Sequence, residues 1–92
     1  MKLWNKYDKR CLPDAESVMR PGPFGNPFVI GKHGTRAEVC GKYAEWIYED
    51  EQRELRNRMR RELAGKDIFC CCVPAQCHGE TILAIANSPM ED

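Results

Sequence analysis

The residues best suited to chemistry in this 92-residue chain are Cys77, His78 and Gly79. The apolar run 68–73 before them has the length of a buried strand and ends at a proline, which cannot donate to a β ladder. From Thr81 onward the apolar spacing predicts an amphipathic helix. The cysteine, histidine and glycine therefore fall at a helix start, where free backbone N–H groups and the helix dipole attract anions and lower the pKa of a thiol.

A phosphate-binding turn is the first chemistry that this arrangement predicts. Arg20 and Arg36 each lie beside a glycine-containing loop, and guanidinium groups pair bidentately with phosphate. Asn26 could bond its own backbone or the base or ribose of a ligand, and Gly79 could simply shape an ordinary strand-to-helix turn. The predicted ligand-binding residues are Arg20, Gly25, Asn26, Arg36, Cys77, His78 and Gly79.

Nucleophilic catalysis through Cys77 is the second possibility, because a helix N-terminus and a histidine both activate a thiol. Sequence neighbours rarely point at each other at a helix start, which makes His78 a poor base for Cys77. His33, in the loop Gly31–Gly34, is the freer candidate. The alternative is that Cys77 only packs beneath the turn.

A metal site is the third possibility, since thiolate and imidazole are zinc ligands. Cys70 and Cys72 share a strand face, but the adjacent Cys77 and His78 would bind one ion awkwardly, and the usual two-residue gap between paired cysteines is missing. We therefore expect no metal and no cofactor, with the strand cysteines acting as small buried hydrophobes.

Composition limits the other classes of function. Lysine plus arginine equal aspartate plus glutamate, fourteen each, so no overall field favours nucleic acid or a membrane. The arginines between Arg53 and Arg61 alternate with glutamates, which predicts a solvated helix face and makes nucleic-acid binding unlikely. Six cysteines without an apolar signal region or a membrane-spanning stretch predict a cytoplasmic protein with reduced thiols.

The elements that must position these residues make an α/β fold. We expect a single domain over 1–92 with its core in 2–87, a small three- to four-stranded sheet, about three helices and a strand–turn–helix core. The expected strands are Lys2–Tyr7, Ser17–Met19 and 68–73, with Phe28–Ile30 a further short strand or a buried anchor. A capping box at Thr35 and Glu38 should start one helix, which buries Val39, Tyr43, Trp46 and Ile47. Glu51–Leu63 should form another that ends at Gly65. So small a core makes a homodimer plausible.

Several short blocks carry a resemblance: Arg20-Pro21, Gly25-Asn26-Pro27-Phe28, Gly34-Thr35-Arg36, Gly65-Lys66-Asp67 and Cys77-His78-Gly79. Together they resemble DUF4326, a family of unknown function found in bacteriophage and bacterial proteins. The resemblance runs from the first strand to Asn87, with Cys71 standing where the family usually has tryptophan and Glu80 where it has aspartate. It implies no activity.

Three functions follow as hypotheses. The first is binding of a phosphate-bearing, nucleotide-like small molecule without turnover. In the phage setting that the resemblance implies, this would sequester an immune signal derived from ADP-ribose or a cyclic nucleotide. The second is a thiol-dependent enzyme acting on such a ligand through Cys77. The third is a zinc-stabilised interaction module.

Overall fold

A three-stranded parallel sheet forms the base of the fold. The computed structural model describes residues 2–11, 14–20, 22–70 and 75–91. The strands are β1 (Leu3–Asn5), β2 (Glu16–Ser17) and β3 (Ile68–Cys70), arranged in the order β1-β3-β2. The predicted α/β fold is confirmed, with β3 central between two parallel partners. The expected continuation of this strand through residues 71–73 lies outside the described residues.

The strands are short, but the hydrogen bonds continue past their ends. The Val18 N–H donates to the Phe69 carbonyl and the Lys6 N–H to the Cys70 carbonyl, both at 3.1 Å. Because all three strands are parallel, their carboxyl ends lie at the same edge of the sheet. Phe28–Ile30 is not a strand but part of the loop that leads from this edge to the first helix.

Three α-helices are found in the described residues: α1 (Arg36–Ile47), α2 (Arg53–Leu63) and α3 (Gly79–Ala86). A 3₁₀ turn, η1 (Asp50–Gln52), precedes α2. The predicted capping box is present: the Glu38 N–H donates to the Thr35 hydroxyl at 3.3 Å, and the Thr35 N–H donates to the Glu38 carboxylate at 3.1 Å. Gly65 follows α2 with a φ of +77°, which fits its predicted place at the end of that helix.

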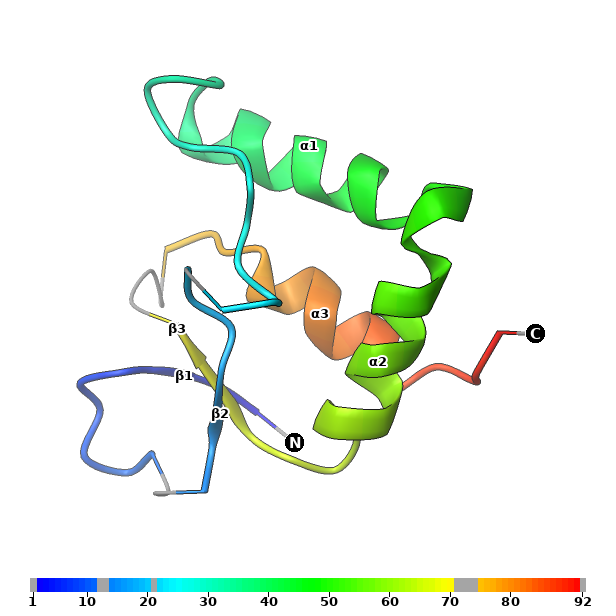
Figure 1. Ribbon diagram of the computed structural model, residues 1–92. Helices are drawn as coiled ribbons and strands as arrows, with labels where there is room; N and C mark the ends of the chain where they lie inside the picture. Colours follow the sequence, from blue (N-terminus) through cyan, green and yellow to red (C-terminus); the bar gives the residue numbers. More distant parts are fainter. Residues whose placement is uncertain (1, 12–13, 21, 71–74, 92) are drawn as a thin grey trace.

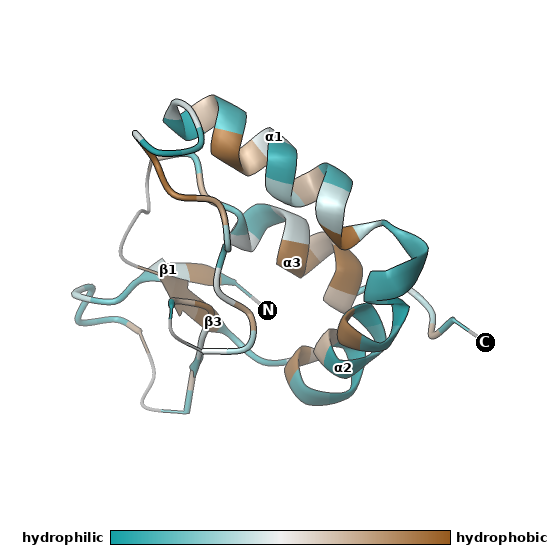
Figure 2. Cartoon of the chain, turned by 45° about the horizontal axis from the view of Figure 1, so that its top comes forward, coloured by the Kyte–Doolittle hydropathy of each residue, from teal (hydrophilic) through white to brown (hydrophobic). Residues whose placement is uncertain are grey.

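Helix α3 lies between the sheet and α1, as Figures 1 and 2 both show. Brown, hydrophobic segments mark β3 and α3 in Figure 2, whereas much of α2 is teal. The fully buried core residues include Tyr43, Ile47, Met59, Leu63, Ile68, Ile82 and Ile85. Trp46 was expected among them but is only partly buried, because it packs at the edge against Phe28 and Tyr43. No helix in the described part of the chain is long and apolar enough to cross a membrane.

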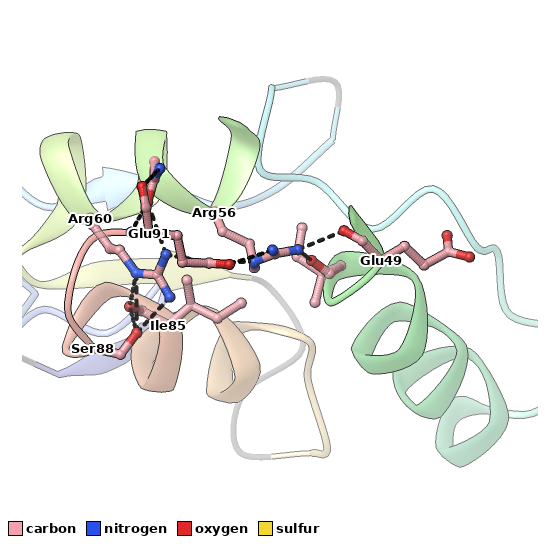
Figure 3. A network of polar contacts seen from close by, with 8 residues as sticks. Glu49, Arg56, Arg60, Ile85, Ser88 and Glu91 are labelled. Carbon is pink, nitrogen blue, oxygen red and sulfur yellow. Dashed lines mark hydrogen bonds and ion pairs between the residues drawn. The ribbon is translucent and has the colours of Figure 1, made fainter. Parts of the chain in front are cut away.

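The prediction of a solvated arginine face on α2 is wrong for Arg56 and Arg60. Their side chains are only 5% and 8% exposed, and both bind the Glu91 carboxylate at 2.6 Å. Arg56 also donates to the carbonyls of Ile47 and Glu49, at 2.8 and 2.7 Å. Figure 3 shows Glu91 between the two guanidinium groups. The C-terminal tail is thereby fixed to α2 and to the end of α1.

This network predicts a loss of stability in acid. The two guanidinium groups hydrogen-bond the Glu91 carboxylate and lower its pKa from the ordinary 4.5 to about 2. A carboxylate with a depressed folded-state pKa stabilises the fold above its unfolded pKa and loses that effect as the pH falls towards the folded value. Glu91→Gln should therefore lower the melting temperature clearly at pH 7, and the difference from the wild type should shrink towards zero between about pH 5 and pH 2.

Glu54→Gln is the matched control, because Glu54 is 79% exposed and pairs with Arg61 on the surface. Its effect on melting should be small at every pH. Thermal unfolding of the variants is followed by circular dichroism. If Glu91→Gln is as stable as the wild type at pH 7, the network does not have this structural role.

Candidate functional site

A cavity of about 330 Å³ opens at the carboxyl edge of the sheet, where the starts of α1 and α3 also lie. Parallel α/β sheets bind ligands at this edge. The cavity brings together five of the seven predicted binding residues, from the loop after β2, the start of α1 and the turn before α3. These are Arg20, Asn26, Arg36, Cys77 and His78.

The cavity has an excess of positive charge. Arg20 and Arg36 line it, and among the described residues neither forms an ion pair with a carboxylate. The Arg36 guanidinium makes one long hydrogen bond, 3.4 Å, to the Gln76 carbonyl. No aspartate or glutamate is found in the described lining, so these charges are available to an anion.

Asn26 holds the loop in place. Its side-chain oxygen accepts the Phe28 N–H at 2.9 Å, and its amide nitrogen donates to the Val39 carbonyl of α1 at 3.3 Å. The self-bonded turn considered from the sequence is therefore observed. The second hydrogen of the same amide has no partner among the described residues, and Asn26 also lines the cavity.

Gly25 and Gly79 are not among the residues that line the cavity; the structure gives both a packing role. A Cβ atom on Gly79 would lie 2.8 Å from Leu3 Cδ1, so this glycine lets the first turn of α3 approach β1. A Cβ atom on Gly25 would lie 2.7 Å from Arg20 Cγ and 2.9 Å from Arg20 Cα. Gly25 thus allows the loop to fold tightly against Arg20.

The buried His78 ring has one defined tautomer. Its Nε2 atom is 2.8 Å from the Val18 carbonyl oxygen and 3.0 Å from that of Phe24. Both oxygens can only accept, so Nε2 carries a proton, and in the neutral ring Nδ1 presents its lone pair. Nδ1 lies 3.7 Å from the Cys77 sulfur. The two neighbours therefore face each other, contrary to the sequence-based expectation.

Cys77 comes directly before His78, the N-cap residue of α3, and its sulfur contacts the first turn of that helix. The Gly79 N–H donates to it at 3.4 Å, at the positive end of α3. His33, the base favoured from the sequence, does not line the cavity. Its Nδ1 atom accepts the Val29 N–H at 2.8 Å and its ring packs edge-on against Phe28, so His33 organises its own loop.

Cys70 completes a buried cluster at the cavity wall. The sulfurs of Cys70 and Cys77 and a ring nitrogen of His78 all lie within 4.8 Å of one another. All three residues are buried and all three line the cavity. Cys72, the fourth residue of the metal set considered from the sequence, lies outside the described residues.

Cys40 and Gln76 also line the cavity and were not expected there. Cys40 follows Arg36 by four residues on α1, and that spacing places both side chains on one helix face. Burial raises the pKa of the Cys40 thiol, whereas the charge of Arg36 lowers it. For Gln76 the sequence holds no comparable signal.

A family model described as a domain of unknown function (DUF4326) matches residues 2–88. No curated protein and no solved structure matches the chain.

Proposed function

The chain belongs to this family, and since the family's description assigns no activity, we propose from the site alone that the protein binds a small, phosphate-bearing, nucleotide-like molecule. The observation that supports this proposal is that Arg20 and Arg36 line the same cavity, beside the starts of two helices. In the described chain neither arginine has a carboxylate partner. Guanidinium groups and helix N-termini both stabilise a bound phosphate.

The remaining wall suits the less polar part of such a ligand. Met19, Phe28, Val29 and Ile30 contribute apolar surface, which a base or ribose can contact. The amide hydrogens of Asn26 supply a directional contact. A volume of about 330 Å³ is at the lower end of small-molecule sites, which favours a compact nucleotide or a part of a larger one.

The cellular effect that we propose is sequestration. A protein that holds a nucleotide signal without converting it lowers the free concentration of that signal, as would be required of an anti-defence protein acting on an ADP-ribose-derived or cyclic-nucleotide messenger. Binding of this kind needs the arginines and the cavity but no nucleophile.

Incubation with a nucleotide panel tests the proposal. The panel contains ADP-ribose, cyclic mononucleotides and cyclic dinucleotides. The protein is separated from free ligand, heated to release what it bound, and the released material is identified by chromatography. We expect one compound to be recovered intact and in stoichiometric amount. If no member of the panel is retained, the proposal is wrong.

Thiol-dependent catalysis remains the second function, because the Cys77 sulfur lies 3.7 Å from Nδ1 of His78. The same experiment separates the two functions. A chemically altered product, formed by the wild type and not by Cys77→Ser, would favour catalysis. Intact ligand recovered from both proteins supports binding.

A further inference from the structure

We propose that Cys70, Cys77 and His78 form a binding site for a Zn²⁺ ion. Two sulfurs and one imidazole nitrogen converge within 4.8 Å in a buried position, although the residues come from β3 and from the start of α3. Two thiolates with one imidazole are a known zinc donor set. This proposal is independent of the nucleotide ligand, because it rests on the cluster and not on the arginines.

The geometry of the cluster fits tetrahedral coordination. With zinc–sulfur and zinc–nitrogen bonds of about 2.3 and 2.0 Å, a sulfur and a nitrogen on the same ion lie about 3.5 Å apart. The Cys77 sulfur and His78 Nδ1 are separated by 3.7 Å. The three ligand atoms lie within 4.8 Å of one another, so side-chain movements of about 1 Å or less bring the two sulfurs to the spacing of about 3.8 Å that the same bond lengths require.

The surroundings orient His78 as a ligand. Metal-binding histidines commonly donate their second ring N–H to a carbonyl or carboxylate, which fixes the tautomer and the ring plane. Here Nε2 donates to the carbonyls of Val18 and Phe24, which leaves Nδ1 directed at Cys77. The Tyr43 ring packs on His78 at 4.9 Å and further restricts its rotation.

Tyr43 supplies an independent observation. Its hydroxyl is buried and has no hydrogen-bond partner in the described chain, which is costly for a polar group. The ring that carries this hydroxyl packs against His78, with the two ring centroids 4.9 Å apart. An unpaired buried hydroxyl on a residue that contacts the cluster therefore marks this part of the core as unusual.

The fourth coordination position would face the cavity, because all three ligands line it. A site with three protein ligands and one open position accepts water or an anionic oxygen. Because the two thiolates neutralise the charge of Zn²⁺, the ion would offer an open Lewis-acid position, and not additional net charge, to the cavity that also holds Arg20 and Arg36.

Cobalt titration tests the site with the metal alone. The full chain, purified without a histidine tag, is stripped with a chelator under reducing conditions and titrated with Co²⁺. We expect one equivalent to bind with thiolate-to-cobalt charge-transfer bands and the strong visible bands of tetrahedral Co²⁺, and Zn²⁺ to displace it. A wild type without charge-transfer bands would overturn the proposal.

Matched variants assign the ligands. Cys70→Ser, Cys77→Ser and His78→Gln should each weaken cobalt binding by more than about 100-fold, which exceeds the loss from removing an outer hydrogen-bond partner. Cys11→Ser and His33→Gln, which lie outside the cluster, should leave binding unchanged. If Cys77→Ser is folded by circular dichroism and binds Co²⁺ like the wild type, the proposal is wrong.

X-ray absorption at the zinc edge of the wild type needs no variant and decides the case if a cluster variant fails to fold. We expect two sulfur neighbours and one imidazole nitrogen around the ion. A shell of four sulfurs, or of oxygen and nitrogen only, would overturn this donor set.

Discussion

Ile68→Ala should lower the free energy of unfolding by about 2–5 kcal/mol. Ile68 is fully buried in β3, the central strand, and its backbone pairs with Leu3 on one side and Glu16 on the other. Truncation removes apolar contacts and leaves a cavity that the flanking strands cannot easily close, because both are hydrogen-bonded to β3. Small domains have about 5–15 kcal/mol of stability in total, so the loss is a large part of it.

Ile30→Ala is the control with the same chemical change. Ile30 is 48% exposed in the loop before α1, and its truncation should alter the free energy of unfolding by less than about 0.5 kcal/mol. Urea denaturation followed by circular dichroism measures both variants. Equal losses in the two would show that β3 does not form the centre of the core.

Local signals predicted most elements correctly because they act over a few residues. The capping box needs only Thr35 and Glu38, three positions apart, and α1 begins where it predicts. The apolar run 68–73 predicts a buried strand, and β3 covers Ile68–Cys70, with Ile68 and Cys70 buried and Phe69 partly exposed. The exact ends of β1 and β2 were not predictable, since their limits depend on pairing with β3 and not on their own sequence.

The arginines of α2 show where local reasoning fails. On the sequence, Arg56 and Arg60 stand among glutamates and resemble their exposed neighbours. They are buried because Glu91, 35 and 31 residues further along, accepts both guanidinium groups. A partner so distant in the chain is set by the tertiary fold, and no helical periodicity contains that information.

The convergence of the cavity residues at one edge of the sheet could be predicted from the sequence, whereas the orientation of His78 could not. Parallel strands bring strand ends and helix starts to one edge, so residues beside those points converge whatever their separation in the chain. The orientation of His78 depends instead on one backbone conformation, φ −61° and ψ −18°, together with the carbonyls of Val18 and Phe24 that hold its ring. Sequence adjacency therefore argued against a contact between Cys77 and His78 that the structure contains.

Arg20→Ala and Arg36→Ala should each weaken binding of ADP-ribose, used as the probe, by ten- to hundredfold. A hydrogen bond to a charged group contributes about 1.5–3 kcal/mol, and each guanidinium would make at least one such contact to phosphate. If the two contacts are independent, the double variant should lose about 10²- to 10⁴-fold. Isothermal titration calorimetry measures the affinities, and if ADP-ribose is not retained in the panel, the recovered nucleotide replaces it as the probe.

The melting temperature of the free protein separates a binding effect from a folding effect. It should barely move in either variant, because Arg20 is exposed and Arg36 makes only the long contact to Gln76 in the described chain. Arg53→Ala is the charge-matched control: Arg53 is exposed on α2, has no carboxylate partner among the described residues and does not line the cavity. If Arg53→Ala weakens binding as much as Arg36→Ala, the attraction comes from net charge and the cavity is not the site. If only the cavity variants lose affinity, and they keep their melting temperature, the phosphate is bound by Arg20 and Arg36.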